Sequence, residues 1–115
     1  MKRLLLDHCV PKPLRRHLPG WPIRTCYEEG WDALRNGELL ATAEAAKFDV
    51  FITADQNLRY QQNLRARRIA IIELPVNRLA MMPLLAPAIQ QALTAATPGS
   101  YAQIPLPTDL TGDAR

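Results

Sequence analysis

The fold is most clearly indicated by one stretch of the sequence, Phe48-Asp49-Val50-Phe51-Ile52-Thr53-Ala54-Asp55-Gln56-Asn57. Residues 50–53 form a run of β-favouring residues, typical of a strand that is buried on both faces. The run stops at a small residue that is followed by the carboxylate of Asp55. In open parallel α/β sheets, ligands bind at the carboxyl ends of the strands. Asp55 therefore stands where a functional site is expected.

Strand and helix patterns alternate along the rest of the chain. Further strands are predicted over residues 4–6, 23–27 and 69–74, and helices over 11–18, 37–47, 58–67 and 79–96. This alternation favours a parallel sheet covered by helices on both faces. Residues 1–96 are expected to form the domain, and residues 97–115 to contribute an edge strand over 101–104 and a flexible tail.

Length, charge and cysteine content narrow the class of protein. A chain of 115 residues is expected to form one domain with its own core, and its net charge of +3 permits nucleic-acid binding without requiring it. The two cysteines, Cys9 and Cys26, are far apart in sequence, which suits a reducing cytoplasmic compartment, and both are expected to be buried. The apolar stretch over 79–89 is too short to span a membrane and contains two prolines, so a soluble protein is expected.

Three carboxylates are expected to meet at one edge of the sheet. Asp7 follows the first strand as Asp55 follows the third, and Glu38 opens the helix that leads back to the third strand. Clustered carboxylates repel each other unless a cation neutralises them, and oxygen ligands suit Mg²⁺ or Mn²⁺. Such a site would support phosphodiester hydrolysis. Taken singly, Asp7 and Asp55 could instead cap turns, and Glu38 could serve the helix dipole.

Three segments together resemble the successive motifs of the small PIN-like domains related to toxin ribonucleases. These segments are Leu4-Leu5-Leu6-Asp7, Asn36-Gly37-Glu38-Leu39-Leu40 and the stretch from Asp49 to Leu58, and the resemblance spans roughly residues 2 to 95. It implies a three-layer α/β/α PIN-like fold around a mainly parallel four- to five-stranded sheet. It also implies Mg²⁺- or Mn²⁺-dependent cleavage of RNA. Many relatives are toxins neutralised by an antitoxin protein encoded alongside, and many form homodimers.

The resemblance also assigns roles by position. Asp7, Glu38 and Asp55 match the catalytic and metal-binding acids, and Thr53 matches the hydroxyl residue that often precedes the last of them. Asn57 stands where many PIN domains have a further aspartate, and His8 stands where many small relatives have a glutamate.

Two arginines near the predicted site are candidates for contact with RNA phosphate. Arg59 follows Asn57 closely, and Arg35 lies close to Glu38. Arginine suits bidentate contact with phosphate, although an arginine on a helix surface needs no special role.

Two other classes of protein are alternatives to a ribonuclease. A non-catalytic module that keeps the fold and binds nucleic acid or a partner protein is one alternative. A phospho-accepting receiver domain is the other, but it needs a lysine late in the chain, and the lysines here are Lys2, Lys12 and Lys47.

Overall fold

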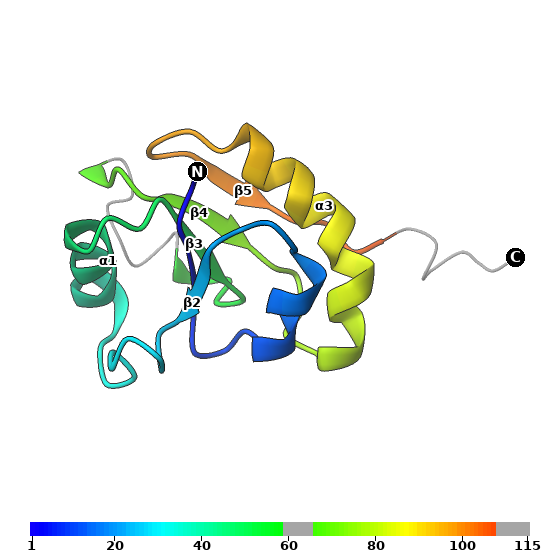
Figure 1. Ribbon diagram of the computed structural model, residues 1–115, viewed down its shortest axis with the longest axis horizontal. Helices are drawn as coiled ribbons and strands as arrows, with labels where there is room; N and C mark the ends of the chain where they lie inside the picture. Colours follow the sequence, from blue (N-terminus) through cyan, green and yellow to red (C-terminus); the bar gives the residue numbers. More distant parts are fainter. Residues whose placement is uncertain (59–65, 108–115) are drawn as a thin grey trace, which may run out of the picture.

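The computed structural model describes residues 1–58 and 66–107, which form a five-stranded sheet with helices on both faces (Figure 1). The strands are β1 (Leu4–Leu6), β2 (Ile23–Thr25), β3 (Val50–Thr53), β4 (Ala70–Glu73) and β5 (Tyr101–Gln103). Their order in the sheet is β2-β1-β3-β4-β5, and every neighbouring pair is parallel. The predicted mainly parallel sheet is therefore entirely parallel in the described part of the chain.

The three central strands β1, β3 and β4 are buried along their whole length because both faces of the sheet are covered. Successive side chains in a strand point to opposite faces. Leu4, Leu6, Val50 and Ile52 belong to a core that includes Leu14 of the 3₁₀ helix η1 (Lys12–His17) and the buried side of α3 (Met82–Ala95). We call this the α3-side core.

The opposite face of the sheet carries the second core. Leu5, Phe51 and Ile71 pack there with Leu39 and Leu40 of helix α1 (Asn36–Ala45). We call this the α1-side core. Figure 1 shows α1 and α3 on opposite sides of the sheet, so the predicted three-layer α/β/α arrangement is confirmed at the level of layers.

Several element boundaries differ from the sequence prediction. The helix predicted over 11–18 is the short 3₁₀ helix η1, and the strand predicted over 23–27 ends at Thr25, where the chain turns. The helix predicted over 79–96 begins as the 3₁₀ turn η3 (Leu79–Met81) and continues as α3. Proline suits the first turn of a helix, and Pro83 occupies that position in α3.

The remaining predictions concern the segments after β3 and after α3. The edge strand predicted over 101–104 is β5, which pairs with β4. Most of the helix predicted over 58–67 lies outside the described residues, but Leu58 at its start is buried in the α1-side core. The end of the predicted tail, residues 108–115, also lies outside them. In the described part of the chain, no helix is long and apolar enough to cross a membrane.

Candidate functional site

The predicted acids after β1 and β3 lie side by side because these two strands are neighbours. β1 pairs with β2 on one side and with β3 on the other. The strand order therefore runs one way from β1 to β2 and the opposite way from β3 to β5, and it reverses between β1 and β3. In doubly wound sheets, such a switch point opens a crevice at the carboxyl ends of the strands. Asp7, immediately after β1, and Asp55, two residues after β3, are both at this edge.

The hydroxyl of Thr53 links the two aspartates. Thr53 is fully buried at the end of β3, and its Oγ1 donates a hydrogen bond to Oδ2 of Asp7 at 2.7 Å. The same Oγ1 accepts a hydrogen bond from the backbone N–H of Asp55 at 3.0 Å. Alternation along the strands explains the arrangement, because Thr53 follows Phe51 and Asp7 follows Leu5 on the α1 side of the sheet.

A cleft of about 410 Å³ opens beside these residues. Both aspartates line it, together with His8, Cys9 and Arg35. Its apolar wall comes from α1 and from the α1-side core, and consists of Leu34, Leu39, Leu40, Phe51, Ala54 and Leu58. The cleft therefore combines two carboxylates and one guanidinium with a largely apolar wall, as is usual for a ligand site.

The structure gives the other predicted site residues different positions relative to this cleft. Glu38 is in the first turn of α1, as predicted, but it is exposed and is not among the residues that line the cleft. Asn57 is exposed, and its backbone N–H donates to Oδ1 of Asp55 at 2.9 Å. Arg59 lies outside the described residues.

Arg35 is well placed to bind an anion. Its Nη1 donates to the backbone carbonyls of Asp32 and Leu34 at 2.9 and 3.0 Å, which holds the guanidinium at the rim of the cleft. The guanidinium has five N–H donors in a planar fork. The donors on its other two nitrogens have no protein partner in the part of the chain that the structure describes, so they remain available to a phosphate.

The sequence did not predict that Cys9 lies in contact with Asp7, because Cys9 was expected to be buried. It is only half-buried, and its Sγ lies 3.6 Å from Oδ2 of Asp7 and 3.4 Å from the backbone nitrogen of Ala54. Burial and the negative charge of Asp7 raise the pKa of the Cys9 thiol. Cys9 follows the end of β1 by three residues, and this closeness to a strand end was the one signal available in the sequence.

Cys26 and His8 complete the surroundings of Asp7. Cys26 is buried as predicted, and burial together with the charges of Asp7, Cys9 and Glu29 raises the pKa of its thiol to about 12. The backbone N–H of His8 and its ring Nδ1 lie 2.8 and 3.0 Å from Oδ1 of Asp7. Asp7 is thus in contact with a hydroxyl, a thiol and an imidazole.

A second hollow, of about 400 Å³, lies at the opposite edge of the sheet, but its carboxylates have structural roles. Glu44 accepts hydrogen bonds from the backbone N–H groups of Arg68 and Ile69 and forms an ion pair with Arg67. Asp49 accepts a hydrogen bond from the backbone N–H of Arg3 at 2.8 Å. These acids hold the ends of strands and loops together, so this hollow is a weaker candidate for chemistry.

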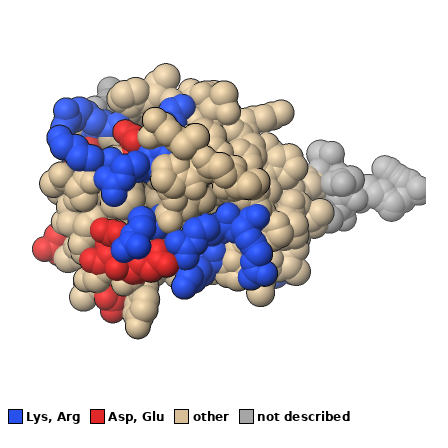
Figure 2. Space-filling model, in the orientation of Figure 1, with Lys and Arg blue, Asp and Glu red and all other residues tan. Residues whose placement is uncertain are grey.

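On the face shown in Figure 2, the basic side chains of the described residues do not form one continuous stripe. Figure 2 shows them in separate groups on the face that it presents, with acidic side chains between and beside them. Part of this charge is neutralised by ion pairs, since Arg15 contacts Glu28 at 2.8 Å and Arg24 contacts Glu29 at 2.6 Å. A long basic groove for nucleic acid is therefore not evident on this face. Any contact with a nucleic acid would depend on the local charges at the cleft.

Comparison of the chain with protein-family models, with curated proteins and with solved structures gives no match.

Proposed function

We propose that this protein is a metal-dependent endoribonuclease of the PIN type, which hydrolyses RNA phosphodiester bonds with Mg²⁺ or Mn²⁺. One observation carries the proposal: Asp7 and Asp55 line the same cleft at the switch point between β1 and β3. Carboxylates gathered at the carboxyl edge of a parallel sheet are well suited to a hard cation that in turn holds a phosphate.

The donor atoms at the cleft suit such a cation. Oδ1 of Asp55 accepts one backbone N–H, and no protein partner of its Oδ2 is found among the described residues. Each oxygen of Asp7 already has two hydrogen-bonding neighbours: Oδ1 has the backbone N–H and the ring of His8, and Oδ2 has the Thr53 hydroxyl and the Cys9 thiol. A cation bound at Asp7 would take the place of the His8 ring or of the Cys9 thiol at one of these oxygens. Magnesium and manganese accept carboxylate oxygens together with several waters, so two aspartates are sufficient to hold either ion.

Each residue at the cleft would have its own role in the hydrolysis. When bound, the cation would supply Lewis-acid activation of the phosphodiester and of the attacking water. The Thr53 hydroxyl fixes the orientation of the Asp7 carboxylate, and the free N–H donors of Arg35 would bind a phosphate oxygen of the RNA. Hydrolysis adds water across the P–O bond, and one ester oxygen leaves as an alcohol.

The proposal also gives roles to Glu38 and Arg59. In the part of the chain that the structure describes, the Glu38 carboxylate has no partner, and Glu38 lies in the same helical turn as Leu39 and Leu40 of the cleft wall. We assign it as a third ligand that turns toward the cleft when the cation binds. Arg59 is assigned to RNA phosphate on its sequence position next to the site.

A thermal melt with Mn²⁺ tests the cation site directly. A dissociation constant of about 100 µM would stabilise the fold by about 1.4 kcal/mol at ~1 mM Mn²⁺. This stabilisation should disappear in Asp55→Asn. A matched control is Asp49→Asn, which removes the same charge at the opposite edge of the sheet and keeps an oxygen that can accept the Arg3 N–H. No shift in the wild-type protein, or an equal loss in both variants, would contradict the proposal.

RNA cleavage tests the activity itself. Purified protein is incubated with a mixture of RNAs in Mn²⁺ or in chelator, beside the variants Asp7→Asn, Glu38→Gln and Asp49→Asn. Cleavage should require the metal, fall at least 100-fold in Asp7→Asn and persist in Asp49→Asn. Cleavage that survives both the chelator and the loss of Asp7 would refute the mechanism, and unchanged cleavage in Glu38→Gln would remove Glu38 from the ligand set.

A non-catalytic module that binds nucleic acid or a partner is the second candidate. It is favoured by Asn57 and His8, which stand where related domains carry acids and so reduce the negative charge of the site. Under this alternative, RNA would bind without being cut, and Arg35→Ala would weaken binding in both the presence and the absence of Mn²⁺.

The receiver-domain alternative is weaker. The strand order β2-β1-β3-β4-β5 is one that receiver domains also have. However, the sequence contains no lysine after Lys47, whereas a receiver needs one beside the phosphorylated aspartate.

The resemblance to toxin ribonucleases extends the proposal to partners. We propose that the protein is the toxin of a toxin–antitoxin pair that acts in the cytoplasm, with RNA as its substrate and a cognate antitoxin protein as its inhibitor. Co-expression of the chain with the product of an adjoining reading frame, followed by copurification, tests this extension. A growth defect that the neighbouring product does not relieve would argue against it.

A further inference from the structure

A compact group of three metal-ligating side chains lies on the side of Asp7 that faces β2. One ligand atom each of Asp7, His8 and Cys26 lies within 4.8 Å of the other two. Asp7 and His8 follow the end of β1, and Cys26 follows the end of the neighbouring strand β2. In the described ranges, 1–58 and 66–107, these residues form the one such group of His, Cys, Asp or Glu side chains.

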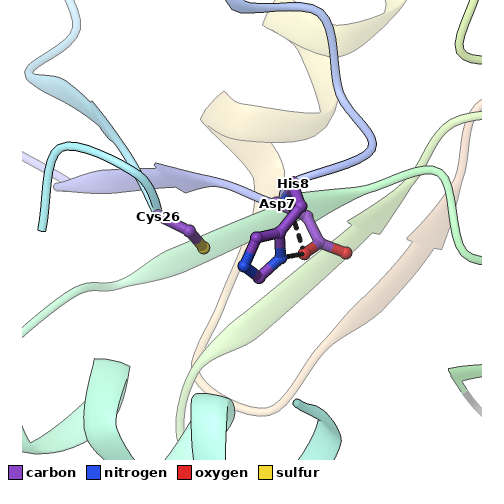
Figure 3. A group of neighbouring side chains, drawn as sticks. All are labelled: Asp7, His8 and Cys26. Atoms are coloured by element: carbon purple, nitrogen blue, oxygen red, sulfur yellow. Dashed lines mark hydrogen bonds and ion pairs between the residues drawn. The ribbon is translucent and has the colours of Figure 1, made fainter. Parts of the chain in front are cut away.

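The three side chains converge from two strands. Figure 3 shows the Cys26 sulfur pointing toward the imidazole of His8, whose other edge meets the Asp7 carboxylate. The parallel pairing of β1 with β2 explains this convergence, since Leu6 is in register with Thr25 and the chain positions that follow are at the same edge of the sheet. All three residues lie in the turns that directly follow β1 and β2, and the pairing of these strands fixes where the two turns begin.

The contacts of His8 place one of its ring nitrogens beside the Asp7 carboxylate. Nδ1 lies 3.0 Å from Oδ1 of Asp7, and Nε2 lies 3.3 Å from the carbonyl oxygen of Trp31. The ring is thus held between two oxygen atoms, with Nδ1 on the side of Asp7 and Nε2 on the side of Trp31.

We propose that Asp7, His8 and Cys26 form a binding site for a thiophilic divalent cation, with Zn²⁺ as the ion that fits best. Thiolate, imidazole and carboxylate are the usual ligands of zinc, and three of them leave a fourth position for water. The site shares Asp7 with the proposed hard-cation site but differs from it because it uses Cys26 and His8 in place of Asp55.

The contacts around the group are those that a metal site requires. A histidine ligand commonly donates its second N–H to a backbone carbonyl, and the Trp31 carbonyl is in position to accept from Nε2 of His8. The Asp7 carboxylate is in turn oriented by the Thr53 hydroxyl at 2.7 Å. Because Asp7 would belong to both sites, Zn²⁺ at this group would compete with Mn²⁺ at the cleft.

Cobalt substitution tests the site without reference to RNA cleavage. Metal-free, reduced protein is titrated with Co²⁺, and the near-ultraviolet thiolate-to-cobalt band and the visible bands of tetrahedral Co²⁺ are recorded. One equivalent should produce both, and Zn²⁺ should abolish them. Cys26→Ser should lose the thiolate band, and His8→Ala should weaken binding by about 10- to 100-fold.

Cys9→Ser is the matched control. Cys9 is also close to Asp7, with its sulfur 3.6 Å from Oδ2, but it is not a member of the group. This variant should keep the thiolate band, and so should Asp55→Asn, which separates the result from the test of the hard-cation site. Folding of each variant is checked by thermal melting in chelator, and because the His8 side chain is partly exposed, His8→Ala provides a test that does not disturb the core.

Three outcomes would overturn the assignment. They are the absence of a thiolate band at millimolar Co²⁺, its persistence in Cys26→Ser, and its loss in Cys9→Ser with retention in Cys26→Ser.

Discussion

Replacing Thr53 by valine tests how the two aspartates of the site are held together. The side chain is fully buried, its hydroxyl donates to Asp7 at 2.7 Å and it accepts the backbone N–H of Asp55 at 3.0 Å. Valine has nearly the same shape as threonine, so no cavity is created. The change in stability therefore reports the loss of the hydroxyl group alone.

The expected loss of folding free energy in Thr53→Val follows from the two hydrogen bonds that the hydroxyl makes. A hydrogen bond to a charged group contributes about 1.5–3 kcal/mol, and a backbone N–H left without a partner costs about 1–3 kcal/mol. Asp7 and Asp55 are both half-buried and can recover some hydration, so values near the lower limits apply, about 3 kcal/mol in total. For a chain of this length, that corresponds to a fall in Tm of about 10–12 °C.

Thermal and urea unfolding of the metal-free protein measure the effect. Thr53→Ser keeps the hydroxyl and should lose only about 1 kcal/mol for the missing methyl group. Thr94→Val is the control on an exposed helix surface, where the hydroxyl bonds to the Gln90 carbonyl, and it should change stability by less than about 0.5 kcal/mol. If Thr53→Val destabilised the fold no more than Thr94→Val, the hydroxyl would not be what couples the two strands.

Three further predictions concern the fold. Hydrogen bonds from Arg15 and from the Thr25 backbone lower the pKa of Glu28 from 4.5 to about 2, so its contribution to stability is present above pH 4.5 and is lost as the pH falls toward 2. The stability difference between the wild type and Glu28→Gln, measured by urea unfolding, should therefore shrink over that range, and a constant difference would contradict it. Leu40 is fully buried in the α1-side core, and Leu40→Ala should cost about 2–4 kcal/mol in the same assay. Gly99 has a φ of +80°, and an added Cβ would lie 3.0 Å from the carbonyl oxygen of Arg67, so Gly99→Ala should lower Tm by several degrees, and an unchanged Tm would mean that this turn can relax.

The strands and layers could be predicted because their signals are local. The apolar runs at 4–6, 50–53 and 69–74 indicate strands buried on both faces, and the structure has β1, β3 and β4 there. The stripe of Leu39, Leu40 and Ala43 likewise indicates which side of α1 is buried. The bounds of α1 were less well predicted: the helix expected over 37–47 is Asn36–Ala45, and no side-chain hydrogen bond marks its start at the N-cap residue Arg35.

The sequence by itself determined that acids follow the first and third strands, since a strand end is visible in a short window of residues. Only the tertiary structure decided that β1 lies between β2 and β3, because strand pairing joins segments that are distant in the chain. This order gives Asp7 two sets of neighbours: Thr53 and Asp55 on the side of β3, and Cys26 on the side of β2. No local pattern predicts the contact of His8 with the Trp31 carbonyl or the exposure of Glu38, because both depend on how loops and helices pack against the completed sheet.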